Sequence, residues 1–167
     1  MLSVFLLLAV WSWGLPATGN SVPPPAQEAS AATEYRAPVK YEPRSDPDKY
    51  LADAVAEAKR SHRNILIEVG GEWCSWCHIM DDFFRTHAEL LALREKNYVL
   101  MKINMSRENE NKAFLSRYPR IHGYPHILIL DAEGKLLFSQ ETSALEDGHS
   151  YHVKRFTKFL DAFAPKS

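Results

Sequence analysis

The order of hydrophobic and polar positions predicts alternating helices and strands after residue 46. Apolar residues recur at helical spacing over 47–61, directly after Asp46-Pro47, a pair typical of a helix start. Helical spacing returns at Cys74, immediately after an apolar run and two glycines. The remaining patterns predict strands over 64–69, 98–104, 126–130 and 135–139, and helices over 87–96, over 108–117 and from Val153 to Phe163.

The connections between these elements predict the type of sheet. Thr86 and Glu89 have the spacing of a capping box, so we expect the helix that starts at Cys74 to be followed by a separate one. A strand, helix, strand order requires a parallel pair, whereas the turn at 131–134 predicts an antiparallel hairpin. We therefore predict an α/β domain with a mixed four-stranded central sheet flanked by helices on both faces.

The first residues have the pattern of an export signal. The apolar run over 2–15 is shorter than the roughly 20 residues that a membrane-spanning helix needs. Ala17 and Gly19 supply the small residues of a signal-peptidase site, so we predict a signal peptide over 1–19, cleaved near Asn20. No Lys or Arg precedes the run, and an uncleaved membrane anchor or a core helix are the alternatives.

The next segment differs in composition from the rest of the chain. Residues 20–45 are rich in Pro, Ala, Ser and Glu and predict a flexible linker, which leaves a domain over 46–167. The net charge is −1 and Lys and Arg are not clustered, so nothing indicates a nucleic-acid partner.

The two cysteines of the chain form a single C-x-x-C motif, Cys74 and Cys77. With no other cysteine, the chain has neither a separate structural disulfide nor the second half of a four-cysteine metal site. In an exported protein such a pair is exposed to oxidants, so we expect it to be used for redox chemistry.

Three stretches together resemble the thioredoxin superfamily. They are the apolar run Ile65–Glu68, the motif Trp73-Cys74-x-x-Cys77, and Gly123-Tyr124-Pro125 directly before a strand. The resemblance covers residues 47–163 and implies a thioredoxin-like fold. Trp76 inside the motif and the split second helix are similar to the branch of exported thioredoxin-like proteins.

The resemblance implies roles for both cysteines, and the physics of a helix start supports them. Cys74 would lie at a helix N-terminus, where free amide groups favour a thiolate, and would attack a substrate disulfide. Cys77, one turn later on the same face, would then attack Cys74 and release the reduced substrate.

Glu68 lies at the strand position where thioredoxins carry a buried Asp beneath the second cysteine. A carboxyl group in an apolar strand is unfavourable when charged, so we expect its pKa to be raised. The resemblance makes Glu68 the proton relay of the exchange, and the alternative is a solvent-facing carboxylate.

Pro125 matches the cis-proline of the family, and with Tyr124 it would form the platform for an extended substrate segment. Trp73 and Trp76 flank the cysteines and are assigned to substrate binding with them, although Trp73 alternatively serves packing alone.

These assignments predict an exported thiol:disulfide oxidoreductase, in the periplasm, that acts on protein disulfides or dithiols without a cofactor. No histidine lies between the cysteines to stabilise the thiolate, which favours a reductase with a membrane-bound thiol reductase as electron donor. Oxidase and isomerase activities stay open at this point.

The same residues permit two other interpretations. With His78 the motif spells C-x-x-C-H, the attachment pattern of c-type haem, for which Met101 or Met105 would be the second axial ligand. A dithiol also suits Cu(I), so a copper chaperone is the alternative of the binding class. The strands around the motif and the Gly-Tyr-Pro stretch favour the redox interpretation.

Overall fold

The computed structural model describes residues 34–166. The predicted signal peptide over 1–19 and the first part of the predicted linker lie outside this range. The described elements are α1 (Pro47–Ser61), β1 (Asn64–Gly70), α2 (Ser75–Thr86), α3 (Ala88–Asn97), β2 (Tyr98–Asn104), α4 (Lys112–Leu115), β3 (His126–Leu130), β4 (Leu136–Glu141), the short 3₁₀ helix η1 (Thr142–Leu145), β5 (Glu146–Asp147), β6 (Ser150–Tyr151) and α5 (Val153–Ala162).

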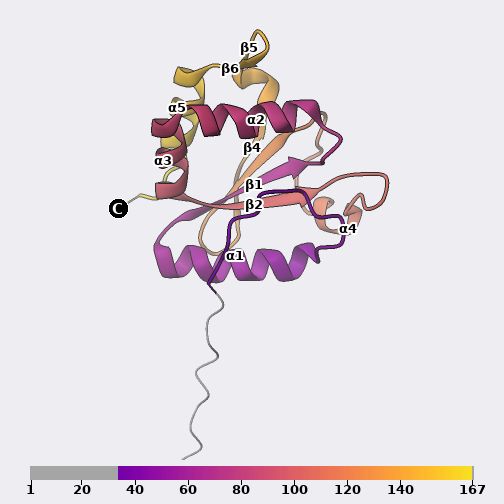
Figure 1. Ribbon diagram of the computed structural model, residues 1–167. Coiled ribbons are helices and arrows are strands. Elements are labelled where there is room, and N and C mark those ends of the chain that lie inside the picture. Colours follow the sequence, from indigo (N-terminus) through magenta and orange to yellow (C-terminus); the bar gives the residue numbers. More distant parts are fainter. Residues whose placement is uncertain (1–33, 167) are drawn as a thin grey trace, which may run out of the picture. The chain divides into compact units, whose positions relative to one another are not determined.

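The central sheet has four strands in the order β2-β1-β3-β4 (Figure 1). β1 and β2 are parallel, whereas β3 is antiparallel to both β1 and β4. The predicted mixed four-stranded sheet is therefore confirmed. A two-stranded ribbon of β5 and β6 lies between β4 and the last helix and was not expected from the sequence.

Helices cover both faces of the sheet, as predicted (Figure 1). Because side chains alternate along a strand, Ile65 and Ile67 of β1 pack toward α1 and α4, whereas Leu66 packs toward α2, α3 and α5. Glu68 and Gly70 have the same parity as Leu66. The last residues of β1 on that face therefore lie beneath the start of α2. No helix within residues 34–166 is long and apolar enough to cross a membrane.

The start of α1 follows from its sequence. The Asp46 carboxylate accepts hydrogen bonds from the backbone amides of Asp48 and Lys49 at 2.9 and 3.3 Å, and Pro47 is the first helical residue. The predicted cap and the boundaries of this helix are thus confirmed.

The predicted capping box at Thr86 is wrong. The Thr86 hydroxyl donates back to the carbonyl of Asp82 at 2.8 Å, so it belongs to the end of α2, and His87 precedes α3 without a side-chain cap. A threonine hydroxyl can donate to a carbonyl one turn back or accept from an amide ahead of it, and Thr86 uses the carbonyls of α2.

The helix predicted over 108–117 is shorter in the structure, where α4 covers only Lys112–Leu115. Asn104 donates to the carbonyl of Asn109, whose own side-chain oxygen accepts from the amide of Asn111. Asn111 has a left-handed backbone conformation, with φ of 47°. These bonds close residues 104–111 into a loop, and α4 starts only at Lys112.

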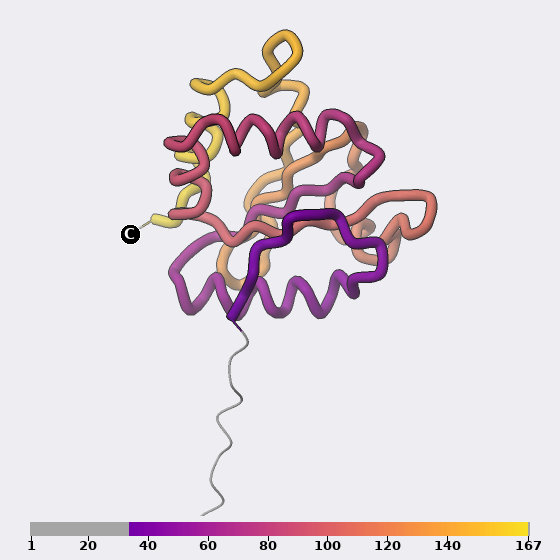
Figure 2. The backbone as a smooth tube through the Cα atoms, in the orientation of Figure 1, coloured from indigo at the N-terminus to yellow at the C-terminus, as the bar shows by residue number. Residues whose placement is uncertain are grey.

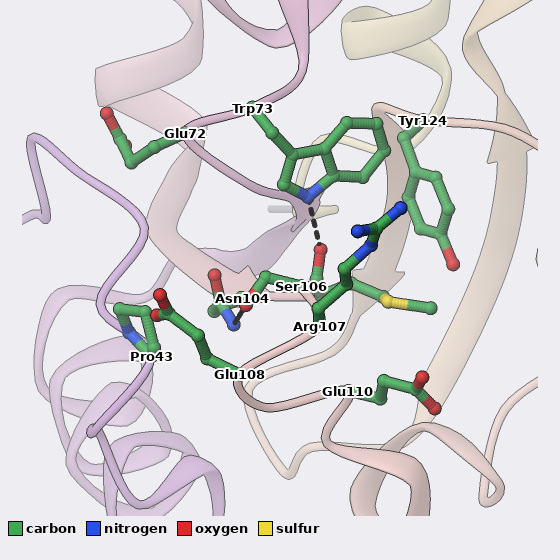
Figure 3. A pocket seen from close by; sticks show the side chains of 10 residues that line it. Pro43, Glu72, Trp73, Asn104, Ser106, Arg107, Glu108, Glu110 and Tyr124 are labelled. Atoms are coloured by element: carbon green, nitrogen blue, oxygen red, sulfur yellow. Dashed lines mark hydrogen bonds between the residues drawn. The ribbon is translucent and has the colours of Figure 1, made fainter.

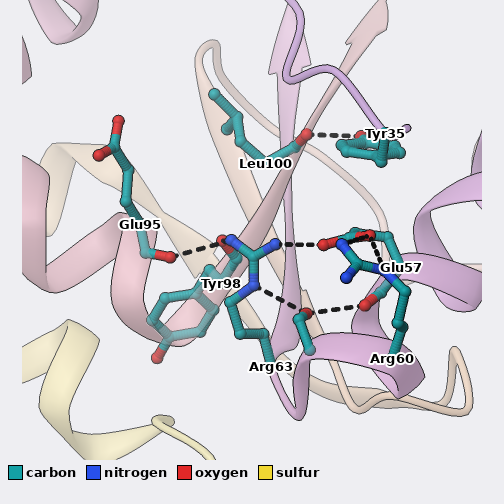
Figure 4. Close-up of polar contacts among 8 residues, drawn as sticks. Tyr35, Glu57, Arg60, Arg63, Glu95, Tyr98 and Leu100 are labelled. Carbon is teal, nitrogen blue, oxygen red and sulfur yellow. Dashed lines mark hydrogen bonds and ion pairs between the residues drawn. The ribbon is translucent and has the colours of Figure 1, made fainter.

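An ion-pair cluster ties the end of α1 to the start of β2 (Figure 4). The buried Glu57 carboxylate accepts from Arg60 and Arg63, each at 2.6 Å. The Arg63 guanidinium also donates to the carbonyls of Glu95 and Tyr98. The cluster thereby positions the edge strand β2 relative to α1.

Residues 34–45, which the composition assigned to a linker, pack against the domain. Tyr35 donates to the carbonyl of Leu100 in β2 at 2.7 Å (Figure 4). Its ring also stacks on that of Tyr50 in α1. Six residues later, Tyr41 is only 2% exposed and packs with both cysteines at the start of α2. Figure 2 shows this segment in indigo as it crosses the sheet between α1 and α2. Its aromatic side chains bury enough apolar surface to fix it there.

Candidate active site

The cysteine pair lies where β1 ends and α2 begins. Cys74 is the N-cap residue of α2 and Cys77 lies in its first turn, with a disulfide bond between them. The amide of Cys77 donates to the Cys74 sulfur at 3.2 Å. Cys77 is fully buried, whereas Cys74 retains 4% exposure. Cys74 therefore has the amide environment that favours a thiolate, and it is the more exposed residue of the pair.

Glu68 is 1% exposed and lies on the cysteine face of β1. Its carboxylate accepts a hydrogen bond from the Tyr41 hydroxyl. Burial raises the pKa of Glu68, although the positive charge of Lys102 and the Tyr41 hydrogen bond oppose that shift. The solvent-facing alternative for Glu68 is thus excluded by its burial.

Lys102 is the buried cation of this face. It lies in β2 opposite Glu68 and is held at 2.6 and 2.7 Å by both carboxylate oxygens of Asp81 in α2. Its ammonium group also lies 4.8 Å from the centre of the Tyr41 ring. Lys102 is hydrogen-bonded to Asp81, and its positive charge lowers the pKa of Glu68 through space.

Trp73 and Tyr124 come together beside the cysteines. Their rings meet edge to face with centroids 5.7 Å apart, and the Trp73 indole donates to the carbonyl of Met105 at 2.7 Å. The Tyr124–Pro125 peptide bond is cis, and β3 begins at the next residue. Trp73 remains 60% exposed, so its ring is available to a ligand at this surface.

A pocket of about 710 Å³ opens next to this aromatic pair (Figure 3). The ring of Tyr124 lies beside the indole of Trp73, and the side chain of Arg107 extends toward both rings. The pocket is lined by the segment before α1, the cysteine loop, the last residue of β2 with the loop after it, and the loop before β3. The lining residues are Pro43, Glu72, Trp73, Asn104, Met105, Ser106, Arg107, Glu108, Glu110 and Tyr124.

Two of the four predicted substrate-binding residues do not line this pocket. Trp76 packs edge to face on Tyr151 with ring centroids 5.5 Å apart. Pro125 instead accepts a hydrogen bond at its carbonyl from Thr142, at 2.5 Å. The structure thus brings Trp73 and Tyr124 together and places Trp76 against the core.

The arrangement does not favour the haem and copper alternatives. Met101 packs with Ile67 on the α1 face of the sheet, opposite the cysteines, and therefore cannot serve as an axial ligand beside them. The Nε2 atom of His78 lies 2.8 Å from the carbonyl oxygen of Glu72, and so already has a partner. Within residues 34–166, no three His, Cys, Asp or Glu side chains are grouped to hold a metal ion.

Sequence reasoning missed Tyr41 and the Lys102–Asp81 pair. The signal for Tyr41 was present, because Tyr35 and Tyr41 are aromatic residues inside a stretch otherwise typical of a linker. The signal for Lys102 was a charged residue within an otherwise apolar strand. The alternation of β2 places it on the same face as Leu100.

Comparison with known proteins gives a consistent result. A family model described as thioredoxin-like matches residues 46–132. A curated relative, the disulfide bond reductase DsbH of Chlamydia pneumoniae, is 26% identical over 95 residues, which cover 52% of this chain and 57% of the relative. The match thus spans little more than half the length of that protein.

Solved structures share the fold. A disulphide isomerase from Xylella fastidiosa Temecula1 superimposes with a TM-score of 0.63 at 22% identity, over 76% of this chain and 96% of that one. A DsbH oxidoreductase gives a TM-score of 0.54 at 21% identity, over 78% and 92% of the two chains. At these identities the likeness concerns the fold, and it confirms the predicted thioredoxin-like architecture.

Proposed function

This chain belongs to the thioredoxin-like family, and from that membership we propose that it catalyses thiol–disulfide exchange on proteins through Cys74 and Cys77. The observation that carries the proposal is the placement of the pair. A disulfide joins the N-cap residue of α2 to its first turn, and it packs on Tyr41, whose hydroxyl donates to the buried carboxylate of Glu68. Such a pair can be opened and closed without refolding the domain.

The proposed exchange begins with the reduced protein. The Cys74 thiolate attacks one sulfur of a substrate disulfide, and the other substrate sulfur leaves as a thiolate. Cys77 then loses its proton and attacks the Cys74 sulfur, which breaks the bond to the substrate and forms the Cys74–Cys77 disulfide. Glu68 is the proposed acceptor of the Cys77 proton, since its raised pKa brings it closer to that of a thiol.

We propose Trp73 and Tyr124 as the substrate platform. Both line the pocket beside the cysteines, and the exposed indole offers a flat apolar surface to a polypeptide. Pro125 and Trp76 would act from outside the pocket, Pro125 by shaping the loop that presents Tyr124 and Trp76 by packing α2 against Tyr151.

We further propose the reductive direction, in an extracytoplasmic compartment. The absence of a histidine between the cysteines favours it, and one curated relative bears the name of a disulfide bond reductase. The apolar run over 2–15 supports export, and a membrane-bound thiol reductase would then supply the electrons. N-terminal sequencing of the protein recovered from its native cell, with Asn20 as the expected first residue, tests the cleaved signal.

Trapping experiments test the exchange itself. A Cys77→Ala variant should accumulate disulfide-linked adducts with a protein disulfide such as insulin, because Cys74 attacks and nothing resolves the product. A Cys74→Ala variant is the matched control and should accumulate few. Adducts from Cys74→Ala alone would reverse the two roles, and no adducts from either variant would overturn the proposal.

The reduction potential of the pair, measured against a glutathione series, tests the direction. A value near that of thioredoxin, about −270 mV, is expected for a reductase, whereas a value near about −120 mV would indicate an oxidase.

A further inference from the structure

The Tyr41 hydroxyl is bonded to the acid and lies near the second cysteine. On one side it donates a hydrogen bond to the Glu68 carboxylate. On the other side, a Cβ built on Gly70 would lie 2.5 Å from the Cys77 sulfur and 2.9 Å from the Tyr41 oxygen. Both atoms therefore border the same small space above Gly70. Tyr41, Cys74 and Cys77 also form one buried cluster.

We propose that Tyr41 relays the proton between Cys77 and Glu68, so that the segment before α1 completes the active site. This proposal rests on the exchange reaction proposed above and assigns it a further residue. The segment is ordered around this residue, because the Tyr41 amide donates to Glu72 at 2.9 Å and the Pro43 carbonyl accepts from Asn109 at 2.8 Å.

The relayed step balances as two coupled proton transfers and one exchange of sulfur bonds. The Cys77 thiol gives its proton to the Tyr41 oxygen, while the Tyr41 proton passes to Oε1 of Glu68. The Cys77 thiolate attacks the Cys74 sulfur and forms the internal disulfide. The bond between Cys74 and the substrate breaks, and its electron pair leaves on the substrate sulfur.

The charges around Glu68 fit this role. Asp81, Lys102 and Arg94 act on the carboxyl group through space, Asp81 unfavourably and the two cations favourably for its charged form. Lys102 is bonded to Asp81, whereas the Tyr41 hydroxyl is in direct contact with the Glu68 carboxylate. Burial also raises the pKa of Tyr41 well above its ordinary value, and the charge of Glu68 raises it further. Tyr41 therefore does not persist as a phenolate and passes a proton only as it receives one.

Single-turnover kinetics with glutathione disulfide separate the two chemical steps. The reduced full-length protein is mixed with increasing concentrations of this probe, and the tryptophans beside the cysteines report the reaction. The initial slope with concentration measures attack by Cys74, and the plateau at high concentration measures resolution by Cys77.

Tyr41→Phe removes the hydroxyl and keeps the buried ring. We expect about a hundredfold lower plateau, at the lower end of the range of general acid–base effects, together with an unchanged slope and loss of the Glu68-dependent limb of the plateau's pH profile. Tyr35→Phe is the matched control, because it removes a hydroxyl from the same segment that bonds Leu100 instead. Its plateau should stay within about twofold of wild type.

A double-mutant cycle with Glu68→Gln tests whether the two residues act as one unit. If they do, the double variant is no slower than the slower single variant, since either change interrupts the relay. Additive losses, or an unchanged plateau and pH profile in Tyr41→Phe, would overturn the proposal.

A proton inventory on the wild-type protein provides a test that requires no variant. Two protons in flight predict a curved dependence of the plateau on the D₂O fraction, and a linear dependence would contradict the relay. Failure of this proposal is distinguishable from failure of the proposed function. The former leaves glutathione disulfide reacting and Cys77→Ala trapping adducts, whereas the latter abolishes both.

Discussion

Replacing Gly70 by alanine tests the close packing above the end of β1. The added methyl group would lie 2.5 Å from the Cys77 sulfur, 2.9 Å from the Tyr41 hydroxyl oxygen and 3.1 Å from the ring carbon that bears it. Ordinary contacts to a Cβ lie at 3.4–4 Å, so the sulfur would have to move by about 1 Å. Gly70 has no positive φ, and the effect of the change is therefore steric.

The neighbours have little freedom to move away. Cys77 is held in the disulfide and in the first turn of α2, and Tyr41 is hydrogen-bonded to Glu68. Overpacking a filled core typically costs about 1–3 kcal/mol, and we expect Gly70→Ala to lower the free energy of unfolding by about that amount. Because Cys77 and Tyr41 are the displaced groups, the resolution step should also slow.

Urea denaturation of the oxidised protein, followed by tryptophan fluorescence, measures the effect. Gly123→Ala is the matched control, because a Cβ at Gly123 would meet no atom within 4 Å and its φ is not positive. The free energy of unfolding of this control should differ from that of wild type by less than about 0.5 kcal/mol. Equal midpoints for both variants would refute the packing of Cys77 and Tyr41 around Gly70.

Two further changes test the acid and the first helix. Burial raises the pKa of Glu68 above its ordinary value of 4.5, so stability should fall as pH rises from that value through the raised pKa, by about 1.4 kcal/mol per pKa unit. Glu68→Gln should remove that loss, so its stability relative to wild type should be higher at pH 8 than at pH 4. Urea midpoints of the variant that keep the wild-type pH dependence would contradict a raised pKa at Glu68. Asp46→Ala should cost about 1 kcal/mol through loss of the α1 cap while leaving exchange rates unchanged, and a stability equal to wild type would argue against the cap.

The sequence was sufficient for the parts of the fold that depend on local patterns. The run of apolar residues in β1, the Asp46 cap and the period of α5 each identify an element from neighbouring residues alone. Thr86 shows the limit of this approach. Its capping spacing is correct, but its hydroxyl has two partners within reach, and the choice depends on how α2 and α3 meet.

The candidate site was predicted unevenly for the same reason. The two cysteines follow from a local motif, and Glu68 follows from its strand position, which the resemblance to thioredoxins matches with their buried acid. Tyr41 could not be placed in this way, because its contacts with Glu68 and Cys77 join residues 27 or more positions apart. Composition predicted a linker for its segment, since averaging over 20–45 conceals the two tyrosines that anchor it.

The sheet order explains why a segment before α1 reaches the active site at all. β2 is an edge strand, and its unpaired backbone groups need a cover, which Tyr35 begins by donating to Leu100. β1 lies one strand further in, so a chain that crosses this edge arrives directly above Glu68. A glutamate extends one methylene further from β1 than the aspartate that thioredoxins carry there. The Glu68 carboxylate accepts a hydrogen bond from the Tyr41 hydroxyl, and Tyr41 packs on both cysteines, so the covering segment contacts the acid and the cysteine pair alike.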